Sequence, residues 1–317
     1  MSNSINHEPM PPALVKWLDA LNQGKKVRTH YHRTPTNVRE GLDVLTRQHV
    51  TAVPEMPLVL DDLVPGAAYL VPVRIYHPQP TEALPVAVFV HGGGHVAGSA
   101  SLYDPIARKL ALAMRHVLVS VDYRLAPECP YPAALLDVMA TVKGVYPLLD
   151  THGLRHLPRL TLAGDSGGGA LSATVAHLCQ FEPSVSIERQ LLIYPSLDYT
   201  LSSPSITSNG DGYLLERERI LWLFDCYLQQ AENRYAISPL FMPITPQYPK
   251  TLIVTAGYCP LHDEGIAYAE RLTAGGIVCE HQDFAGMIHT FLNLEDLVPQ
   301  ECARLYQQVR DFCSQAA

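Results

Sequence analysis

Residues 164–168 read Gly-Asp-Ser-Gly-Gly, and they decide the fold because they stand directly between an apolar strand pattern and a helical one. The stretch has the form G-x-S-x-G, in which a serine sits on a sharp strand-to-helix turn with its hydroxyl exposed. Flanking glycines permit the bend, and the N-terminus of the following helix favours negative charge at Ser166. The pattern also occurs by chance in glycine-rich loops, but in this context it predicts a nucleophilic serine.

A second glycine-rich stretch, His91-Gly92-Gly93-Gly94-His95, follows the apolar run 84–90. Three glycines allow backbone N–H groups to approach a substrate oxygen, and preorganised donors of this kind stabilise an oxyanion by about 3–4 kcal/mol each. A phosphate-binding loop and a metal pair formed by the two histidines are alternative interpretations. No Gly-Lys-Ser/Thr follows, and such a loop does not fix the spacing of two ligands, so we favour oxyanion stabilisation.

One histidine near the C-terminus completes this pattern. His289 lies in the run 286–291 (GMIHTF), after the strand-like segment 277–284. It is one of 14 histidines, and it gains weight from its place after Ser166, because serine, acid, histidine is one of the chain orders in which such a site occurs. A neutral imidazole here would take the Ser166 proton and later return it to the leaving group.

Outward from these motifs, apolar runs alternate with segments of helical period. Several runs are continuously apolar, as expected for strands buried on both faces. This alternation predicts a mostly parallel sheet flanked by helices, with an antiparallel start before 84–90. The strand-like runs are 67–76, 84–90, 116–122, 159–163, 190–194 and 251–256, and the helical segments are 102–115, 133–149, 168–181 and 263–275.

Two regions interrupt the alternation. Residues 13–22 have the period of a short amphipathic helix, and 199–248 contain one helix-like segment, 214–229. We expect 1–55 and the insertion 199–248 to form a cap over a core of 56–198 and 249–317, which ends in a helix at 299–315. The apolar residues expected to line the pocket under this cap are Trp17, Leu18, Tyr213, Leu214, Trp222 and Leu223.

Composition excludes several classes of protein. The 317 residues carry a net charge of −8, which argues against nucleic acid as a partner. No apolar run approaches the ~18 residues of a membrane span, and Lys16 and Asp19 interrupt the first apolar segment, so no signal peptide is expected. Seven cysteines without a C-x-x-C pair predict reduced thiols in the cytoplasm rather than disulfides or a zinc site.

Taken together, the motifs resemble those of the hormone-sensitive lipase family of α/β-hydrolase carboxylesterases. The resemblance rests on His91–Gly94, Gly164–Gly168, and the run 122–128 (DYRLAPE), and it covers roughly residues 65 to 315. It implies an α/β-hydrolase fold, a helical cap built from the N-terminus and the insertion after the sixth strand, and hydrolysis of short-chain carboxylic esters without a cofactor or metal. Similar proteins commonly dimerise through the sheet edge, so a homodimer is a further expectation.

The resemblance also assigns roles to residues. Ser166 would be the nucleophile and His289 its base, and the N–H groups of Gly92, Gly93 and Gly167 would form the oxyanion hole. Arg124 and Glu128 would be structural. Related esterases often carry a bulky aromatic residue at the position of His95, which would either make the acyl pocket more polar or stack as an aromatic ring does.

The chain departs from the family at the catalytic acid. Cys259 stands where the family has Asp in a D-P-L-x-D-E run, here 259–264 (CPLHDE), and the spacing to His289 matches. The acid fixes the tautomer of the base and stabilises its imidazolium, and a neutral amide in its place costs a serine protease ~10⁴ in turnover. A thiol is a weak acceptor with an ordinary pKa of ~8.5.

Three repairs of this defect are open at this point. Asp263 or Glu264 could reach back to His289, although both begin the following helix. Asp198 could serve instead, because some lipases carry the acid after the preceding strand. Finally, Cys259 could pair with His289 as a thiolate, or the Ser–His pair could act unaided.

We expect weak but retained esterase activity. The alternatives are a catalytically impaired ligand-binding protein on the same fold and an amidase or deacetylase.

Overall fold

A single eight-stranded sheet forms the centre of the molecule, in the order β1-β2-β4-β3-β5-β6-β7-β8. The computed structural model describes residues 8–27 and 33–315. Strand β2 is antiparallel to both β1 and β4, and the other neighbouring pairs are parallel, which confirms the mostly parallel sheet with an antiparallel start. The strands are β1 Leu58–Pro65, β2 Leu70–His77, β3 Leu84–Val90, β4 Val117–Val121, β5 His156–Asp165, β6 Ile187–Ile193, β7 Lys250–Tyr258 and β8 Cys279–Ile288.

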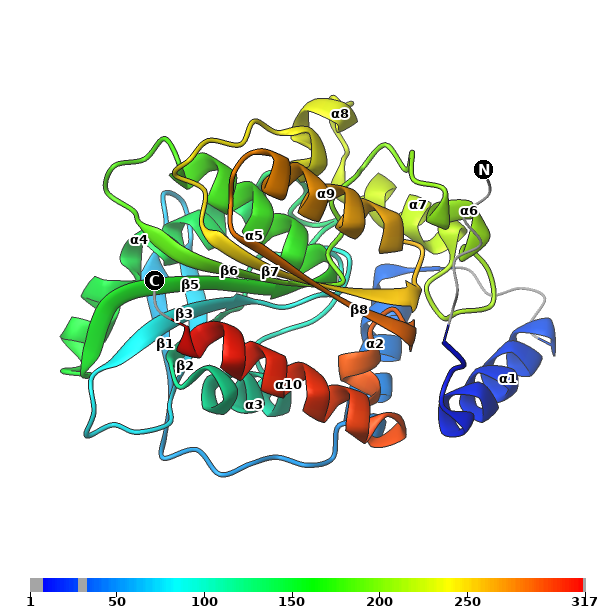
Figure 1. The fold of residues 1–317 in the computed structure, drawn as a ribbon, viewed down its shortest axis with the longest axis horizontal. Helices are drawn as coiled ribbons and strands as arrows, with labels where there is room; N and C mark the ends of the chain where they lie inside the picture. The colour runs from blue at the N-terminus through cyan, green and yellow to red at the C-terminus, as the bar shows by residue number, and fades with distance from the viewer. Residues whose placement is uncertain (1–7, 28–32, 316–317) are drawn as a thin grey trace.

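Helices cover both faces of the twisted sheet (Figure 1). One face carries α3 (Asp104–Met114) and α10 (Pro299–Ser314), which pack against each other. The other carries α4 (Ala133–Thr151), α5 (Ser166–Cys179) and α9 (His262–Ala274). This layering follows from right-handed crossovers between parallel strands, and it confirms the predicted α/β architecture.

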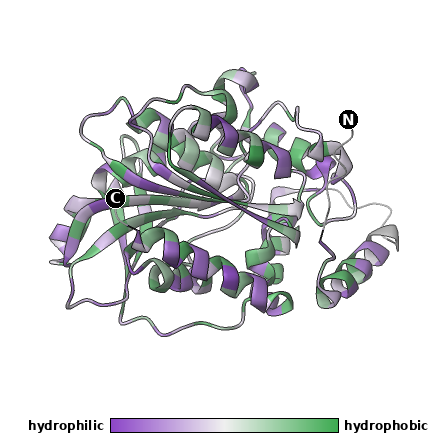
Figure 2. Cartoon of the chain, viewed as in Figure 1, coloured by the Kyte–Doolittle hydropathy of each residue, from purple (hydrophilic) through white to green (hydrophobic). Residues whose placement is uncertain are grey.

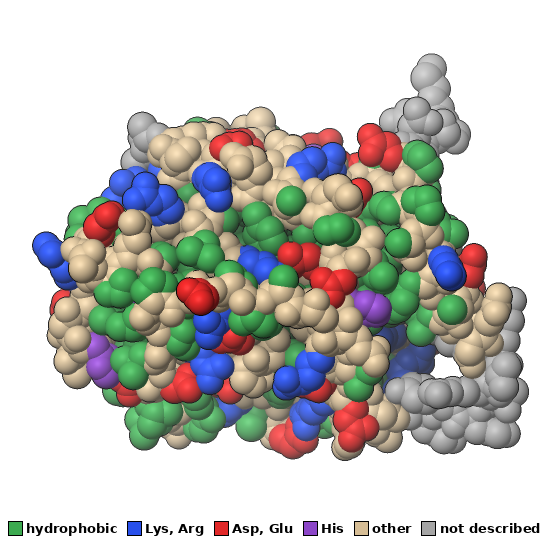
Figure 3. Space-filling view, turned by 90° about the horizontal axis from the view of Figure 1, so that it is seen from below, with side chains coloured by type: hydrophobic (Ala, Val, Ile, Leu, Met, Phe, Trp, Pro, Cys, Tyr) green, Lys and Arg blue, Asp and Glu red, His purple; other side chains and the backbone are tan. Residues whose placement is uncertain are grey.

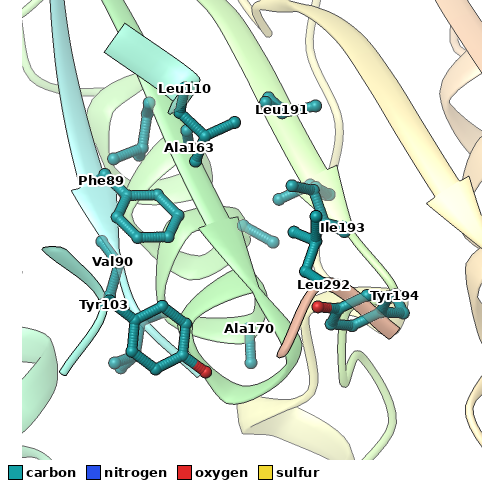
Figure 4. Close-up of a cluster of buried hydrophobic side chains, with 14 of the residues drawn as sticks. Phe89, Val90, Tyr103, Leu110, Ala163, Ala170, Leu191, Ile193, Tyr194 and Leu292 are labelled. Carbon is teal, nitrogen blue, oxygen red and sulfur yellow. The ribbon is translucent and has the colours of Figure 1, made fainter. Parts of the chain in front are cut away.

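The core lies between the sheet and these helices. Strands β3 to β7 are apolar along most of their length, and β4 is buried throughout. Figure 2 shows hydrophobic residues concentrated on the central strands, and Figure 4 shows one cluster in which Phe89, Leu110 and Leu191 are fully buried. Burial on both faces explains why these strands read as continuous apolar runs.

Two parts of the chain lie beyond the carboxyl ends of the parallel strands. The insertion between β6 and β7 holds α6 (Ser205–Ser208), α7 (Arg217–Tyr227), α8 (Arg234–Ile237) and the 3₁₀ helix η1 (Pro239–Phe241). The N-terminal part holds α1 (Pro12–Val27) and α2 (Pro35–His49). Helix α2 packs on η2 (Phe291–Leu297), where Asn293 Nδ2 donates to Thr46 Oγ1 at 3.0 Å.

Strand β1 was not predicted from the sequence, which assigned no regular structure to residues 56–66. Its side chains are alternately half-buried and exposed, apart from the buried Val64, and Asp61 and Asp62 interrupt its apolar residues. A half-exposed edge strand of this kind gives only a weak period-2 signal.

The surface carries mixed charge. On the face seen in Figure 3, acidic and basic side chains are interspersed without a large area of one sign. Among the helices of the described residues, none combines the length and the apolar character needed to cross a bilayer.

Candidate active site

Ser166 lies at the turn where β5 ends and α5 begins. Its φ of +52° is a strained left-handed conformation for a residue with a side chain. The flanking glycines are required by close backbone contacts, because a Cβ on Gly168 would lie 2.1 Å from Val90 O and one on Gly164 would lie 2.4 Å from Gly168 O. The strand, the bend and the helix therefore present the Ser166 hydroxyl at the first turn of α5.

His289 follows β8 and reaches this hydroxyl. Ser166 Oγ and His289 Nε2 are 2.8 Å apart, which is hydrogen-bond distance. Burial lowers the pKa of His289 to about 3, and the positive charge of Arg219 acts in the same direction. The imidazole is therefore neutral at pH 7 and has a free lone pair on one nitrogen with which to accept a proton.

Cys259 occupies the other side of the imidazole. Its Sγ lies 3.1 Å from His289 Nδ1 and accepts a hydrogen bond from Leu261 N–H at 3.3 Å. Burial raises the pKa of the Cys259 thiol well above its usual value, so the sulfur is protonated at neutral pH. A neutral thiol can donate to Nδ1 or accept from it, and it therefore does not select one tautomer of His289.

The structure does not bring Asp198 or Asp263, two of the three candidate replacement acids, to His289. Asp198 is held by its own loop, where its carboxylate accepts from the N–H and hydroxyl groups of Thr200 and Ser202 at 2.5–3.0 Å. Asp263 accepts from Ser205 N–H at 2.9 Å and contacts His262.

Glu264 is turned away as well. Its carboxylate is buried and accepts from the N–H groups of Leu197 and Asp198, at 2.6 and 3.4 Å. Within 33–315 the hydrogen-bonded partner of His289 Nδ1 is thus a thiol and not one of the expected carboxylates.

The glycine loop gives a second correction. Gly92 N–H donates to Asp165 Oδ1 at 2.6 Å, so this donor is committed and does not face the cavity over Ser166. Gly93 and Gly94 line that cavity together with Gly167. The loop and the nucleophile turn are close here, because a Cβ added to Gly167 would lie 3.2 Å from Gly94 N. Positive φ angles of +122° at Gly93 and +62° at Gly94 turn this part of the loop toward Ser166, a conformation that favours glycine.

Asp165, the variable residue of G-x-S-x-G, was missed as a site residue by the sequence analysis. It accepts from Gly92 N–H and from the Tyr103 hydroxyl, the latter at 3.2 Å, and so joins the nucleophile turn to the glycine loop. Burial raises the pKa of Asp165 to about 7, an effect that these two hydrogen bonds partly offset.

Tyr194 was missed as well. Its ring packs edge-to-face on His289 with 4.9 Å between centroids, and it lies with Tyr103 at one end of the buried cluster in Figure 4. Its backbone φ is +36°.

The two histidines of the glycine loop are packed as aromatic rings. His91 stacks on Tyr123 with 4.4 Å between centroids, and His95 stacks on Tyr227 with 3.9 Å. His95 Nε2 also contacts the Tyr199 hydroxyl at 3.2 Å, and burial lowers the pKa of His95 to about 3. These contacts favour the second of the two interpretations of His95, a neutral stacked ring.

An ion-pair network joins α2 to the loop 122–128. Arg39 donates to both carboxylate oxygens of Glu128, at 3.0 and 2.6 Å, and to Val96 O at 2.8 Å. Arg124 forms a two-pronged pair with Asp137 on α4, with 2.8 Å between the closest atoms. None of these contacts touches Ser166 or His289, in keeping with a supporting role for Arg124 and Glu128.

A cavity of about 890 Å³ opens above the serine. It contains Ser166, His289, Gly93, Gly94 and Gly167, together with residues of α1, α2 and α7. Of the predicted liners, Trp17, Leu214 and Leu223 are present, whereas Leu18, Tyr213 and Trp222 do not line it. Leu18 is instead buried, since it belongs to the packed face of α1.

Comparison with known proteins places this geometry in a family. A family model described as "alpha/beta hydrolase fold" matches residues 87–293. The chain is 34% identical over 309 residues to the esterase LipI of Mycobacterium tuberculosis, covering 94% of this chain and 93% of that protein. It is 38% identical over 239 residues to the carboxylesterase NlhH of the same species, covering 72% and 73%.

Solved structures agree with these sequence relatives. An ester hydrolase from the metagenome of Lake Arreo superposes with a TM-score of 0.89 at 29% identity, covering 96% of this chain and 98% of that one. An esterase from Pyrobaculum calidifontis gives 0.86 at 29% identity, covering 97% and 100%. The chain is therefore a hydrolase that belongs to the hormone-sensitive lipase family of α/β-hydrolase carboxylesterases.

Proposed function

We propose that this protein hydrolyses short-chain carboxylic esters through an acyl-enzyme on Ser166, at a rate limited by Cys259. The observation that carries the proposal is the 2.8 Å hydrogen bond between Ser166 Oγ and a neutral His289 Nε2. That contact is the geometry a serine nucleophile needs from its base.

The proposed reaction has two halves. His289 Nε2 takes the proton from Ser166 as its oxygen attacks the ester carbonyl, and N–H groups of Gly93 and Gly167 hold the oxyanion. His289 then gives the proton to the departing alcohol, which leaves the acyl group on Ser166. Water attacks this acyl-enzyme by the same sequence and releases the acid.

Cys259 is proposed to slow both halves. Each attack converts His289 to an imidazolium inside a buried site, where an unpaired charge is costly. An aspartate would stabilise that cation and hold the productive tautomer, whereas a protonated thiol does neither.

We further propose that residues 1–55 and 199–248 act as a cap that selects the substrate. Side chains of α1, α2 and α7 line the cavity over Ser166, which supports this assignment. A cytoplasmic location is proposed from the seven free cysteines of the described chain. A homodimer stays a prediction, to be checked by light scattering.

The test is a labelling experiment combined with a substrate panel. A fluorophosphonate probe should label the wild-type protein at Ser166 and fail to label Ser166→Ala. The same variant should lose hydrolysis of 4-nitrophenyl acetate by about 10⁴-fold or more, because the nucleophile is gone.

Two results would favour the alternatives. An unlabelled, inactive wild-type protein would favour a ligand-binding role. Faster serine-dependent cleavage of amides than of matched esters would favour an amidase or deacetylase.

A further inference from the structure

His262 is a buried imidazole that the proposed reaction does not use. It is the first residue of α9, and 4% of its surface is exposed. Its Nδ1 lies 3.0 Å from Asp263 Oδ1, and its Nε2 lies 3.3 Å from Asp283 Oδ1 on β8. A neutral imidazole has one N–H and one lone pair, so it would turn that lone pair toward one of the two carboxylates. The arrangement therefore calls for the imidazolium.

The titratable groups packed around His262 favour this protonated form. Burial lowers the pKa of His262, but the hydrogen bonds and negative charges of Asp263 and Asp283 outweigh it and raise the pKa from 6.5 to about 9. The nearby His281 on β8 has its pKa lowered by burial and is neutral at pH 7. Glu264, the other acidic residue in the first turn of α9, is turned away to accept from the Leu197 N–H.

Each of the two carboxylates is itself fixed to another element. Asp283 accepts from Thr255 Oγ1 at 2.8 Å, across the pairing of β8 with β7. Asp263 accepts from the Ser205 N–H at 2.9 Å, on α6 of the insertion. His262 therefore joins the start of α9 to the edge of the sheet, where α9 packs beside β7 and β8 (Figure 1).

This junction lies between the two segments that meet at the Nδ1 side of the base. The His262 N–H donates to Cys259 O at 3.1 Å and closes the turn that begins at Cys259, whose Sγ lies 3.1 Å from His289 Nδ1. Asp283 lies on β8, the strand that ends at Ile288, one residue before His289. The contact between His262 and Asp283 thus connects the loop of the thiol to the strand that leads to the base.

We propose that protonated His262 is a positioning residue, which holds the loop of Cys259 against β8, and that its deprotonation sets the alkaline limit of hydrolysis. The inference rests on the proposed roles of Ser166 and His289. Once the proton is lost, Asp263 and Asp283 remain as neighbouring carboxylates without a cation between them, and the first turn of α9 loosens. The loop and the strand then no longer hold His289 in one geometry, so kcat falls while the protein stays folded.

The test is the pH profile of kcat for ethyl butanoate, measured at saturating substrate in a pH-stat with subtraction of the uncatalysed rate. In the wild type, kcat should decline by about three- to tenfold between pH 8 and pH 10 and should recover on return to pH 7.5. The midpoint should lie near pH 9 and coincide with the titration of the His262 ring in ¹H–¹³C NMR spectra. Tryptophan fluorescence at each pH shows whether the protein is folded.

Asp283→Asn is the variant whose effect a merely structural role does not explain. With one carboxylate fewer, the imidazolium loses its proton more easily, so the midpoint of the decline should move down by about one pH unit. His262→Arg keeps a positive charge at every pH of the profile, and the decline near pH 9 should disappear. If His262→Arg does not fold, the shift in Asp283→Asn decides alone.

His281→Gln is the matched control. His281 lies on the same strand as Asp283, and its Nε2 contacts the same Thr255 hydroxyl at 2.8 Å. Because burial keeps His281 neutral throughout the alkaline range, its replacement should leave the midpoint of the decline unchanged.

Cys259→Asp makes the measurement more sensitive. A carboxylate beside Nδ1 supports the imidazolium only in the correct geometry, so kcat of this variant depends more strongly on the position of the loop than kcat of the wild type does. The alkaline decline should therefore exceed about tenfold in Cys259→Asp, with the same midpoint.

Three outcomes overturn the inference: no decline of kcat up to pH 10, a decline with the same midpoint in the wild type, Asp283→Asn and His262→Arg, or a decline that only follows the loss of folded protein. In each case, hydrolysis at pH 7.5 that depends on Ser166 would leave the proposed function standing. No hydrolysis and no labelling of Ser166 at pH 7.5 would remove both proposals.

Discussion

The two ring nitrogens of His289 face two regions that differ in the chemical groups they present to the ring. On the Nε2 side, the nucleophile turn (residues 164–168) and the glycine loop (residues 91–95) meet with a serine at 2.8 Å and backbone donors beyond it. On the Nδ1 side, the acid loop (residues 259–264) supplies a thiol at 3.1 Å. The nucleophile side thus keeps a serine at hydrogen-bond distance, whereas the other side has a neutral thiol where the family has a carboxylate.

The acid loop is held in place by contacts with α6 and β8. Ser205 on α6 donates from its hydroxyl to Pro260 O at 2.7 Å and accepts from Asp263 N–H at 3.1 Å. His262 contacts both Asp263 and Asp283, which raises its pKa to about 9. The proposed weakening of catalysis therefore concerns the Cys259 side chain and not the backbone that carries it.

The largest effect is expected from restoring that side chain. Cys259→Asp should raise kcat by about 10²- to 10⁴-fold, because a carboxylate beside Nδ1 selects the productive tautomer and stabilises the imidazolium. Leu261 N–H, which now donates to the sulfur, is available as a second donor to the carboxylate. Steady-state kinetics on 4-nitrophenyl acetate gives the answer.

Cys259→Ala is the matched control for this gain. If the thiol contributes little, its loss should lower kcat by less than about tenfold. A much larger loss of kcat in Cys259→Ala, together with no gain in Cys259→Asp, would show that the thiol already supports His289 as well as a carboxylate would.

The second effect concerns Asp165, which joins the nucleophile turn to the glycine loop. Its pKa in the folded protein, about 7, exceeds the ordinary value of 3.8, so the folded state binds the proton more tightly. Wild-type stability should therefore decline as pH rises from about 4 to 7, by on the order of 4 kcal/mol from this group. Asp165→Asn keeps an acceptor for Gly92 N–H but removes the titration.

Urea denaturation at several pH values measures this difference. The stability of Asp165→Asn relative to wild type should increase across the same window. A constant difference at all pH values would contradict the assignment.

The smallest effect is expected at Asp198. Asp198→Asn should leave kcat within about twofold, because the carboxylate contacts Thr200 and Ser202 rather than His289. It should lower the free energy of unfolding by about 1–3 kcal/mol, since one oxygen that accepts two hydrogen bonds becomes a donor. A hundredfold loss of kcat at unchanged melting temperature would instead make Asp198 the acid of the site.

The sheet and the serine–histidine pair could be predicted because their signals are local. Continuous apolar runs identified the buried strands. The glycines at 164 and 168 on either side of Ser166 are required because a Cβ added to either would lie less than 2.5 Å from a backbone oxygen. Strand β1 was not predicted, because Asp61 and Asp62 interrupt the apolar residues of this edge strand.

The rest of the site depends on contacts between distant segments. Gly92 and Asp165 are 73 positions apart in the chain, and their hydrogen bond was not predicted: Gly92 was expected in the oxyanion hole, and no role was assigned to Asp165. Arg219 lies on a helix that was predicted, but only the folded insertion brings it to the cavity that contains Ser166. Only the structure could show that Asp198 and Asp263 are engaged elsewhere.

The attachment of Ser205 to the acid loop has a consequence for altering this enzyme. The insertion that brings Leu214 and Leu223 to the cavity over Ser166 also holds the loop of Cys259, since Ser205 bonds to Pro260 and Asp263. Grafting a foreign sequence over 199–216 to broaden the range of accepted esters would also shift position 259. Engineering of selectivity and of turnover in this scaffold should therefore proceed together, with both segments varied in one library.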